Sequence, residues 1–280
     1  MELQQRIEHL FVEQKQNWPQ LRSAIEQLDN IRTRELSWGS DNNVVIQFNP
    51  ARVVSAAAKT DAASIESRPC FLCEENRPEV QKGVEFLNKY IILANPFPIL
   101  SNHLTIALHS HVPQLIGKKI GDLLTLAEEL PDYIVFYNGP KSGASAPDHF
   151  HMQAGLKSDI LMQGDNELRS CFVIEGATKL EVEQGFEDVY FYLSKRQPQE
   201  QEPMMNVIAF VDRGKYILHV FPRKQHRPMQ YNTTGKRQLM ISPGAIDMAG
   251  LIITVREEDF EKLKKEDVED IYSQVSMSVI

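Results

Sequence analysis

The strongest constraint on the fold is a short stretch in which polar and apolar side chains alternate. His149, His151 and Gln153 are polar, whereas Phe150 and Met152 are apolar. Successive side chains of a β-strand point to opposite faces of its sheet. The pattern therefore predicts a strand with both imidazoles and the amide on one face and apolar side chains on the other.

A loop rich in small residues precedes this strand, and it contains Gly139, Lys141, Gly143 and Ser145. Glycines let backbone N–H groups approach an anion closely, and hydroxyl groups add further donors. Phosphoryl transfer requires chiefly positioning and neutralisation of oxygen charge. We therefore predict a phosphate-binding loop that leads into a strand carrying histidines.

His151 is the candidate nucleophile. A neutral imidazole with an unperturbed pKa near 6.5 is largely deprotonated at cellular pH, so it can attack phosphorus without a strong base. Covalent catalysis by a histidine would divide a difficult transfer into two easier displacements. Isolated histidines on strands are usually structural, but two on one face with Gln153, directly after such a loop, favour a functional site.

A second motif, Cys70-Phe71-Leu72-Cys73, has the spacing of a zinc-binding pair. Spacing alone does not choose the two further ligands, for which the candidates are His103, His109, His111 and His149. Buried or spare cysteines are the alternative interpretation. A thioredoxin-like redox role is disfavoured, because the surrounding βαβ pattern is missing.

The overall charge bounds the possible partners. The 280 residues carry a formal net charge of −8, which argues against a nucleic-acid partner. Apolar runs such as residues 90–94 are too short to span a bilayer, and the polar start of the chain does not look like a signal peptide. We therefore expect a cytoplasmic protein without a membrane partner, in which a phosphate-bearing ligand meets a local basic cluster.

Three basic residues at strand ends are candidates for that cluster. Arg52 follows a strand expected over residues 43–48, and Arg223 and Lys224 follow a strand that ends at Pro222. Each could bind the substrate by supplying the positive charge that the acidic chain lacks. The alternative interpretation is that each is a solvent-exposed residue of a turn, which the sequence alone does not distinguish from a substrate ligand.

The order of expected elements indicates an α+β fold with mainly antiparallel sheets and flanking helices. Residues 1–40 would form an N-terminal helical segment, followed by a half at 41–165 and a second half at 166–280. Residues 103–113 and 216–228 each consist of a strand, a basic or His-rich turn and a proline, which suggests that the halves are duplicated.

Some individual elements are tested by the structure below. Residues 188–193 and 238–242 are expected to be strands, because they are rich in β-branched, aromatic or apolar side chains. Residues 55–67, which are rich in Ala and Ser, have no clear period and are expected to be an extended or mobile loop.

The His-x-His-x-Gln motif, with Asn138-Gly139 and Ser142-Gly143-Ala144-Ser145 before it, resembles the active-site signature of the histidine-triad superfamily. The similar branch holds galactose-1-phosphate uridylyltransferase, diadenosine tetraphosphate phosphorylase and the GDP-hexose phosphorylases. Residues 241–250 and the turn at 221–223 are also similar to segments of the phosphorylases. The likeness spans roughly residues 45–260.

This resemblance implies two histidine-triad-like halves and assigns roles to the motif. His151 would become nucleotidylated, and Gln153 would hold the phosphate oxygens. Asn138, Gly143 and Ser145 match the loop that touches the phosphates. The family likeness also implies a homodimer.

The resemblance also implies a ligand set for a structural zinc ion. Some uridylyltransferases bind zinc through a Cys pair, a histidine after the preceding strand and the first motif histidine. By that match, Cys70, Cys73, His111 and His149 would be the ligands. Two departures from the uridylyltransferase pattern, Phe150 in place of proline and the short chain, favour the phosphorylases, among which the zinc pair is not general.

These observations lead to one functional hypothesis. The protein would be a nucleotidyltransferase acting through a nucleotidyl-histidine intermediate on a nucleoside diphosphate sugar or a dinucleoside polyphosphate. Phosphate or a sugar phosphate would be the acceptor. The alternatives are a nucleotide hydrolase that uses the same histidine and a non-catalytic nucleotide-binding regulator.

Overall fold

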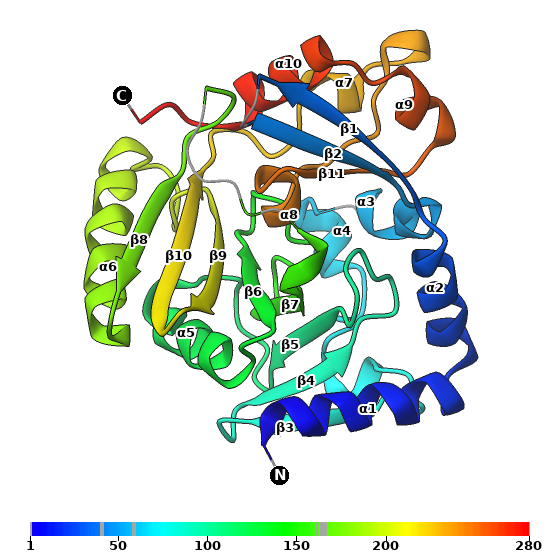
Figure 1. The fold of residues 1–280 in the computed structure, drawn as a ribbon, viewed down its shortest axis with the longest axis vertical. Helices are drawn as coiled ribbons and strands as arrows, with labels where there is room; N and C mark the ends of the chain where they lie inside the picture. Colours follow the sequence, from blue (N-terminus) through cyan, green and yellow to red (C-terminus); the bar gives the residue numbers. More distant parts are fainter. Residues whose placement is uncertain (1, 40–41, 58–59, 161, 163–166, 280) are drawn as a thin grey trace.

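The computed structural model describes residues 2–39, 42–57, 60–160, 162 and 167–279. Its central element is an eight-stranded sheet in which every neighbouring pair of strands is antiparallel (Figure 1). In spatial order the strands are β3 (Gly83–Phe86), β4 (Tyr90–Ala94), β5 (Leu104–Leu108), β7 (His151–Leu156), β6 (Tyr133–Asn138), β9 (Met205–Asp212), β10 (Lys215–Pro222) and β8 (Phe172–Gly176).

The sheet is continuous across the two predicted halves. Strands β3 to β7 come from the first half and β8 to β10 from the second, and β6 pairs with β9 where they meet. In this register Val135 lies opposite Ala209 and Asn138 lies opposite Asn206. The predicted boundaries at 40/41 and 165/166 fall outside the described residues, so the division into domains stays a prediction.

A smaller sheet packs above the large one in Figure 1. It consists of β1 (Arg32–Trp38), β2 (Asn42–Phe48) and β11 (Leu251–Thr254). Strand β11 pairs with β2 in parallel, although more than 200 residues of sequence separate them. The sheet therefore ties the start of the chain to its C-terminal part.

The helices are α1 (Leu3–Asn17), α2 (Pro19–Asp29), α3 (Val53–Ala56), α4 (Ala62–Glu66), α5 (Ile120–Glu129), α6 (Lys179–Arg196), α7 (Met229–Asn232), α8 (Ala245–Met248), α9 (Glu257–Lys262) and α10 (Lys265–Val275). Of these, α1, α5 and α6 pack on one face of the large sheet and α8 on the other, while α9 packs on the small sheet. The expected α+β class, with mainly antiparallel sheets and flanking helices, is confirmed.

Side-chain alternation along β6 shows how the two faces build two cores. Val135 and Tyr137 pack into the core under α1, α5 and α6. Ile134 and Phe136 pack into the other core, formed with β2, α8, α9 and α10. All four side chains are buried, because a strand in the middle of this sheet is covered on both faces.

The strand expected at residues 188–193 is wrong, because these residues belong to α6. The tyrosines and valine there favour a strand by propensity. A capping box opposes them: Thr178 accepts from the backbone N–H of Glu181, and Glu181 accepts from that of Thr178. Tertiary packing of α6 on β8 and β10 then overrides the local preference.

Three further expectations need correction. Residues 55–67 are not simply extended, since α3 ends within them and α4 is capped by Asp61, which accepts from the backbone N–H of Ser64. Residues 58–59 lie outside the described part. Residues 238–242 are irregular instead of a strand, and residues 32–38 of the expected N-terminal helical segment 1–40 form the strand β1.

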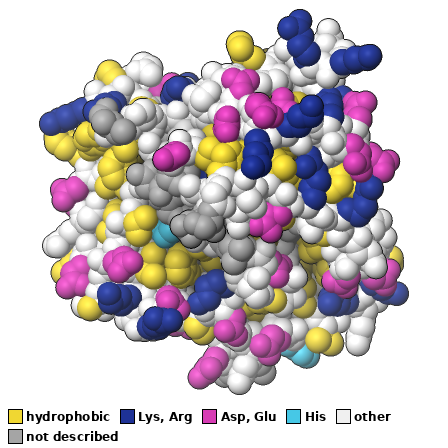
Figure 2. All heavy atoms as spheres, turned by 45° about the horizontal axis from the view of Figure 1, so that its top comes forward, with side chains coloured by type: hydrophobic (Ala, Val, Ile, Leu, Met, Phe, Trp, Pro, Cys, Tyr) yellow, Lys and Arg dark blue, Asp and Glu magenta, His cyan; other side chains and the backbone are white. Residues whose placement is uncertain are grey.

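The surface carries charges of both signs. Figure 2 shows Lys and Arg side chains interspersed with Asp and Glu over one face. Among the described residues, none of the helices combines the length and the apolar character that crossing a bilayer would require.

The close approach of α6 to β8 generates a testable prediction. A Cβ atom at Gly185 would lie 2.6 Å from Cγ2 of Ile174, a branched side chain that cannot easily move away. Gly185→Ala should therefore lower the free energy of unfolding by about 1–3 kcal/mol, although alanine is the better helix former. Chemical denaturation measures this change.

Gly117→Ala is the matched control, because no atom lies within 4 Å of a Cβ built there. It should leave stability nearly unchanged. Adding Ile174→Ala to Gly185→Ala should remove the clash, and a Gly185→Ala protein as stable as the parent would contradict the described packing.

Candidate active site

The histidine strand β7 lies in the middle of the sheet, between β5 and β6. Phe150 and Met152 are buried in the core under the helices. His151 and Gln153 point the other way and line a cavity of about 720 Å³. The expected alternation therefore holds for Phe150 to Gln153, but His149 lies before β7 and turns toward Cys70 instead of sharing the cavity with His151.

One fixed hydrogen bond orients the ring of His151. Its Nδ1 lies 2.9 Å from the backbone carbonyl oxygen of His149. A carbonyl can only accept, so Nδ1 carries the proton and the lone pair is on Nε2. Burial lowers the pKa of His151 to about 4, which keeps the ring neutral at neutral pH.

Gln114 holds the backbone around this histidine. Its side-chain oxygen accepts from the N–H of His151 at 2.7 Å, and its amide nitrogen donates to the carbonyl oxygens of His151 and Asn138. Gln114 is fully buried. Sequence reasoning missed this residue, because a glutamine after Pro113 belongs to no motif.

The side chain of Gln153 is held by His103, which directly precedes the neighbouring strand β5. Its Oε1 lies 2.9 Å from Nε2 of His103, and Nδ1 of His103 accepts from the backbone N–H of Ile99 at 3.1 Å. Burial lowers the pKa of His103 to about 3. His103 is therefore neutral and belongs to this site instead of the cysteine pair.

The loop after β6 contacts the second half of the chain. Asn138 accepts from the side chain of Asn206 at 2.8 Å and from the backbone N–H of Ala245 at 2.7 Å. Gly143 has a φ of +97°, and a Cβ there would lie 2.8 Å from the Cα of Gly244. Glycine is therefore required where the two loops touch.

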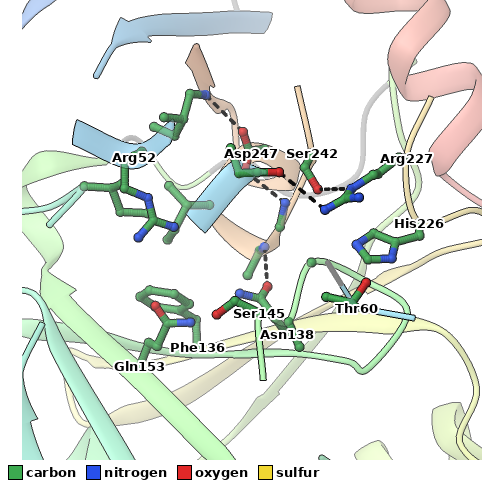
Figure 3. Close-up of a pocket in the computed structure, with 18 of the residues that line it drawn as sticks. Arg52, Thr60, Phe136, Asn138, Ser145, Gln153, His226, Arg227, Ser242 and Asp247 are labelled. Carbon is green, nitrogen blue, oxygen red and sulfur yellow. Dashed lines mark hydrogen bonds between the residues drawn. The ribbon is translucent and has the colours of Figure 1, made fainter. Parts of the chain in front are cut away.

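A smaller pocket of about 60 Å³ adjoins the main cavity and shares five lining residues with it (Figure 3). The shared residues are Arg52, Asn138, Gly143, Ser145 and Gln153. Figure 3 shows Arg52 on one side of the pocket and Arg227 on the other. Both belong to the lining, so the basic groups that the acidic chain lacks overall are present here.

Charges within this small pocket are partly compensated. Burial lowers the pKa of Arg52 to about 10, so the guanidinium stays cationic at neutral pH. Asp247 accepts from the backbone N–H groups of Gly244 and Ile253, and burial raises its pKa to about 6. The pocket is thus polar, with two arginines and one carboxyl group.

Other predicted substrate ligands lie elsewhere. Lys141 pairs with Glu200 at 2.7 Å on the surface, and the backbone N–H of Gly139 donates to the carbonyl oxygen of Met205. Neither lines the two cavities, and nor does Lys224. A substrate-binding role for these three residues stays a prediction.

Arg223 is fully buried and donates to five protein oxygens instead of lining a cavity. These oxygens belong to Asn206, Pro243, Gln225, His226 and Val275. Arg227, four residues later, lines the small pocket and bonds Ser242 Oγ at 2.9 Å. A basic turn was therefore identified in the sequence, but spacing could not show which cation faces the cavity.

Cys70, Cys73, His111 and His149 bring four possible ligand atoms within 4.8 Å of one another. The Cys70 Sγ to His149 Nδ1 and Cys73 Sγ to His111 Nδ1 distances are both 3.3 Å. Ligand atoms around tetrahedral zinc are separated by roughly 3.5 Å. The cluster could therefore hold a metal ion.

The protonation of His149 suits a metal ligand. Its Nε2 lies 2.7 Å from the carbonyl oxygen of Leu108, so Nε2 carries the proton and Nδ1 offers a lone pair to the cluster. His109 pairs with Glu85 instead. The structure thus brings together the four residues of the implied ligand set and leaves His103 and His109 outside it.

Comparison with known proteins relates this arrangement to solved structures. The structure of yeast Ap4A phosphorylase Apa2 in complex with Ap4A is similar, with 21% sequence identity, a TM-score of 0.66, and coverage of 98% of this chain and 97% of that chain. Apa2 in another crystal structure gives 18% identity and a TM-score of 0.59, with coverage of 92% and 96%. At these identities the likeness shows the fold alone, an α+β fold similar to that of Apa2.

A weaker likeness is to an ADP-glucose phosphorylase from Arabidopsis thaliana with bound ADP-glucose, at 14% identity, a TM-score of 0.38, and coverage of 88% of this chain and 100% of that chain. A search of curated proteins found no match to this chain. A family model described as a domain of unknown function (DUF4922) matches residues 10–156, which is more than half of the chain. The chain therefore belongs to the DUF4922 family.

Proposed function

We propose that this protein is a nucleotidyltransferase in which His151 carries a nucleotide between two phosphate compounds. The observation that carries the proposal is the orientation of His151. Its Nδ1–H is held by the carbonyl oxygen of His149, which leaves Nε2 as the nucleophilic nitrogen at the cavity. The fold shared with an Ap4A phosphorylase supports this assignment.

The first displacement forms a nucleotidyl-histidine. Nε2 of His151 attacks the α-phosphorus of the donor, a P–N bond forms, and the P–O bond to the leaving phosphate breaks with its electrons. The ring becomes cationic, and the carbonyl oxygen of His149 stabilises it through the unchanged Nδ1–H bond. No proton has to leave the ring.

The second displacement regenerates the free histidine. An oxygen of inorganic phosphate or of a sugar phosphate attacks the same phosphorus, and the P–N bond breaks with its electrons returning to Nε2. Asn138, Ser145 and Gln153 lie where the two cavities meet and would donate to the phosphoryl oxygens. Arg52 and Arg227 would neutralise phosphate charge in the small pocket.

We infer the donor class from the size and lining of the main cavity and from the groups that would bind phosphate. The main cavity of about 720 Å³ lies within the range of small-molecule sites, and Trp18, Phe71 and Phe97 contribute aromatic rings to its lining. We propose a nucleoside diphosphate sugar or a dinucleoside polyphosphate as donor. The related yeast enzyme has been crystallised with Ap4A and with AMP, which is consistent with a nucleotide site.

We further propose that the cluster of Cys70, Cys73, His111 and His149 binds a structural zinc ion. Zinc would tie the cysteine loop to the residue that orients His151. Phe71 and Leu72, between the two cysteines, line the main cavity, so the same loop forms part of its wall. The homodimer and the cytoplasmic location stay predictions.

His151→Asn should abolish the covalent intermediate and lower turnover by about 10⁴-fold or more, because it removes the nucleophile. The measurement is intact-protein mass spectrometry after incubation with ADP-glucose, GDP-glucose, GDP-mannose, UDP-glucose or Ap4A without acceptor. An acid-labile adduct of one nucleoside monophosphate is expected on the parent protein and not on the variant. Product analysis with and without phosphate then separates transfer from hydrolysis.

Thermal unfolding of His151→Asn should remain close to that of the parent, which excludes misfolding as the cause. Full turnover in this variant would refute the mechanism. Binding of nucleotides by the parent without any adduct or turnover would instead support the alternative of a non-catalytic nucleotide-binding regulator.

Cys70→Ser should reduce the zinc content of the purified protein and lower Tm by roughly 5 °C or more, because a lost metal site removes binding free energy from the folded state. Elemental analysis and thermal unfolding are the measurements. Cys171→Ser is the matched control, since Cys171 is also buried but lies outside the cluster. Unchanged zinc in Cys70→Ser would contradict the ligand set.

A further inference from the structure

The cavity contains two carboxamides whose orientation is fixed by donors behind them. We infer that His103, Asn206 and Arg223 are positioning residues, which force Asn138 and Gln153 to present their NH2 groups to the ligand. The site thereby selects a group with only acceptor oxygens, such as a phosphoryl group. This inference rests on the proposed function for the identity of that group.

The first chain of hydrogen bonds begins at a guanidinium. Arg223 Nη1 donates to Asn206 Oδ1 at 2.6 Å, and arginine has no acceptor atom with which to reverse this bond. Asn206 must therefore turn its Nδ2 toward Asn138, whose Oδ1 lies 2.8 Å away. The backbone N–H of Ala245 donates to the same Oδ1 at 2.7 Å.

The second chain begins at a backbone N–H. Ile99 donates to Nδ1 of His103, so the proton of the neutral ring sits on Nε2. That Nε2–H donates to Oε1 of Gln153 at 2.9 Å. Amide oxygen and nitrogen atoms are often assigned ambiguously, but each of these chains starts from a group that can only donate.

Both chains end in the same way. The side-chain oxygens of Asn138 and Gln153 are occupied by protein donors, and within the described part of the chain no group accepts from their NH2 groups. Both residues line the main cavity and the small pocket. Two amides therefore present their NH2 groups to a ligand at the junction of the cavities, while their oxygens accept from protein donors behind them.

Burial preserves this arrangement. His103, Asn206 and Arg223 are each no more than 1% exposed, so water does not compete for their bonds. A carboxamide turned by 180° would place its NH2 against an N–H donor and would leave both unsatisfied in a buried site. The donor orientation is thus built into the protein before a ligand binds.

Double-mutant cycles test whether the positioning residues act through the amides. His103→Phe keeps a ring packed beside Phe136, whose centroid lies 5.8 Å from that of His103, but removes both nitrogens. It should lower kcat/KM for the donor by about tenfold or more, because Gln153 loses its fixed orientation. In a Gln153→Ala background the same change should cost less than about threefold.

Asn206→Asp is the corresponding test for the orientation of Asn138. The carboxylate keeps the bond from Arg223 but can no longer donate to Asn138, so a similar loss in kcat/KM is expected. That loss should be clearly smaller in an Asn138→Ala background, where only the charge of the aspartate and the lost bond to the carbonyl oxygen of Ser142 remain. His219→Phe is the control, since it removes another buried histidine, on β10, that lies outside both cavities. Losses that multiply in the double variants would overturn the inference.

Two measurements do not depend on turnover. In the free protein, ¹⁵N NMR should show His103 as the neutral Nε2–H tautomer at neutral pH, and an Nδ1–H tautomer would overturn the second chain. Inorganic phosphate should bind His103→Phe and Asn206→Asp about tenfold more weakly than the parent. A parent protein that forms no nucleotidyl adduct would refute the proposed function, whereas unchanged phosphate binding in both variants would refute the positioning role.

Discussion

The pairing of β6 with β9 is the interaction on which the site depends. It joins the strands of the first half to those of the second and sets Asn138 directly opposite Asn206. Asn138 ends the strand that leads into the loop before His151, whereas Asn206 is held by a buried arginine of the second half. A shift of one residue in this register would separate the two amides and turn each strand's side chains to the wrong face.

The site also shows how one buried polar group determines the chemistry of the next. The carbonyl of His149 fixes which nitrogen of His151 carries the proton, while the side chain of His149 turns toward the cysteines. The proposed metal site and the proposed nucleophile therefore share a single residue. Gln114 adds rigidity by bonding the backbone of both β6 and β7.

Much of this arrangement was predictable from local sequence patterns. The alternation around His151 predicted a strand and the two faces of its residues 150–153, because the period of a strand is a local property, but it did not show that His149 lies before the strand and turns toward the cysteines. The Cys70 and Cys73 pair was recognised, but only the family resemblance selected His111 over His109. In α6, packing on β8 and β10 overrides the aromatic strand formers, and the capping box of Thr178 and Glu181, which is a local signal, was overlooked.

The cations illustrate the same limit at the site. The basic turn after β10 was noticed, yet the buried residue proved to be Arg223 and the cavity residue Arg227. Sequence cannot show which way a side chain leaves an irregular turn. His103 was considered only as a metal ligand. Its contact with Gln153 joins two segments that are distant in the sequence, so no periodic pattern indicates it.

The β6–β9 pairing has a further consequence for the region that defines the family. Residues 10–156 contain the proposed nucleophile and all four members of the cysteine–histidine cluster, but β9 lies outside this region. On its own, the region would end its sheet at β6, a strand of six buried residues with its backbone groups unpaired along one side. Such an edge invites association with other chains, so the second half serves as the cover of a sheet edge as well as a wall of the pocket.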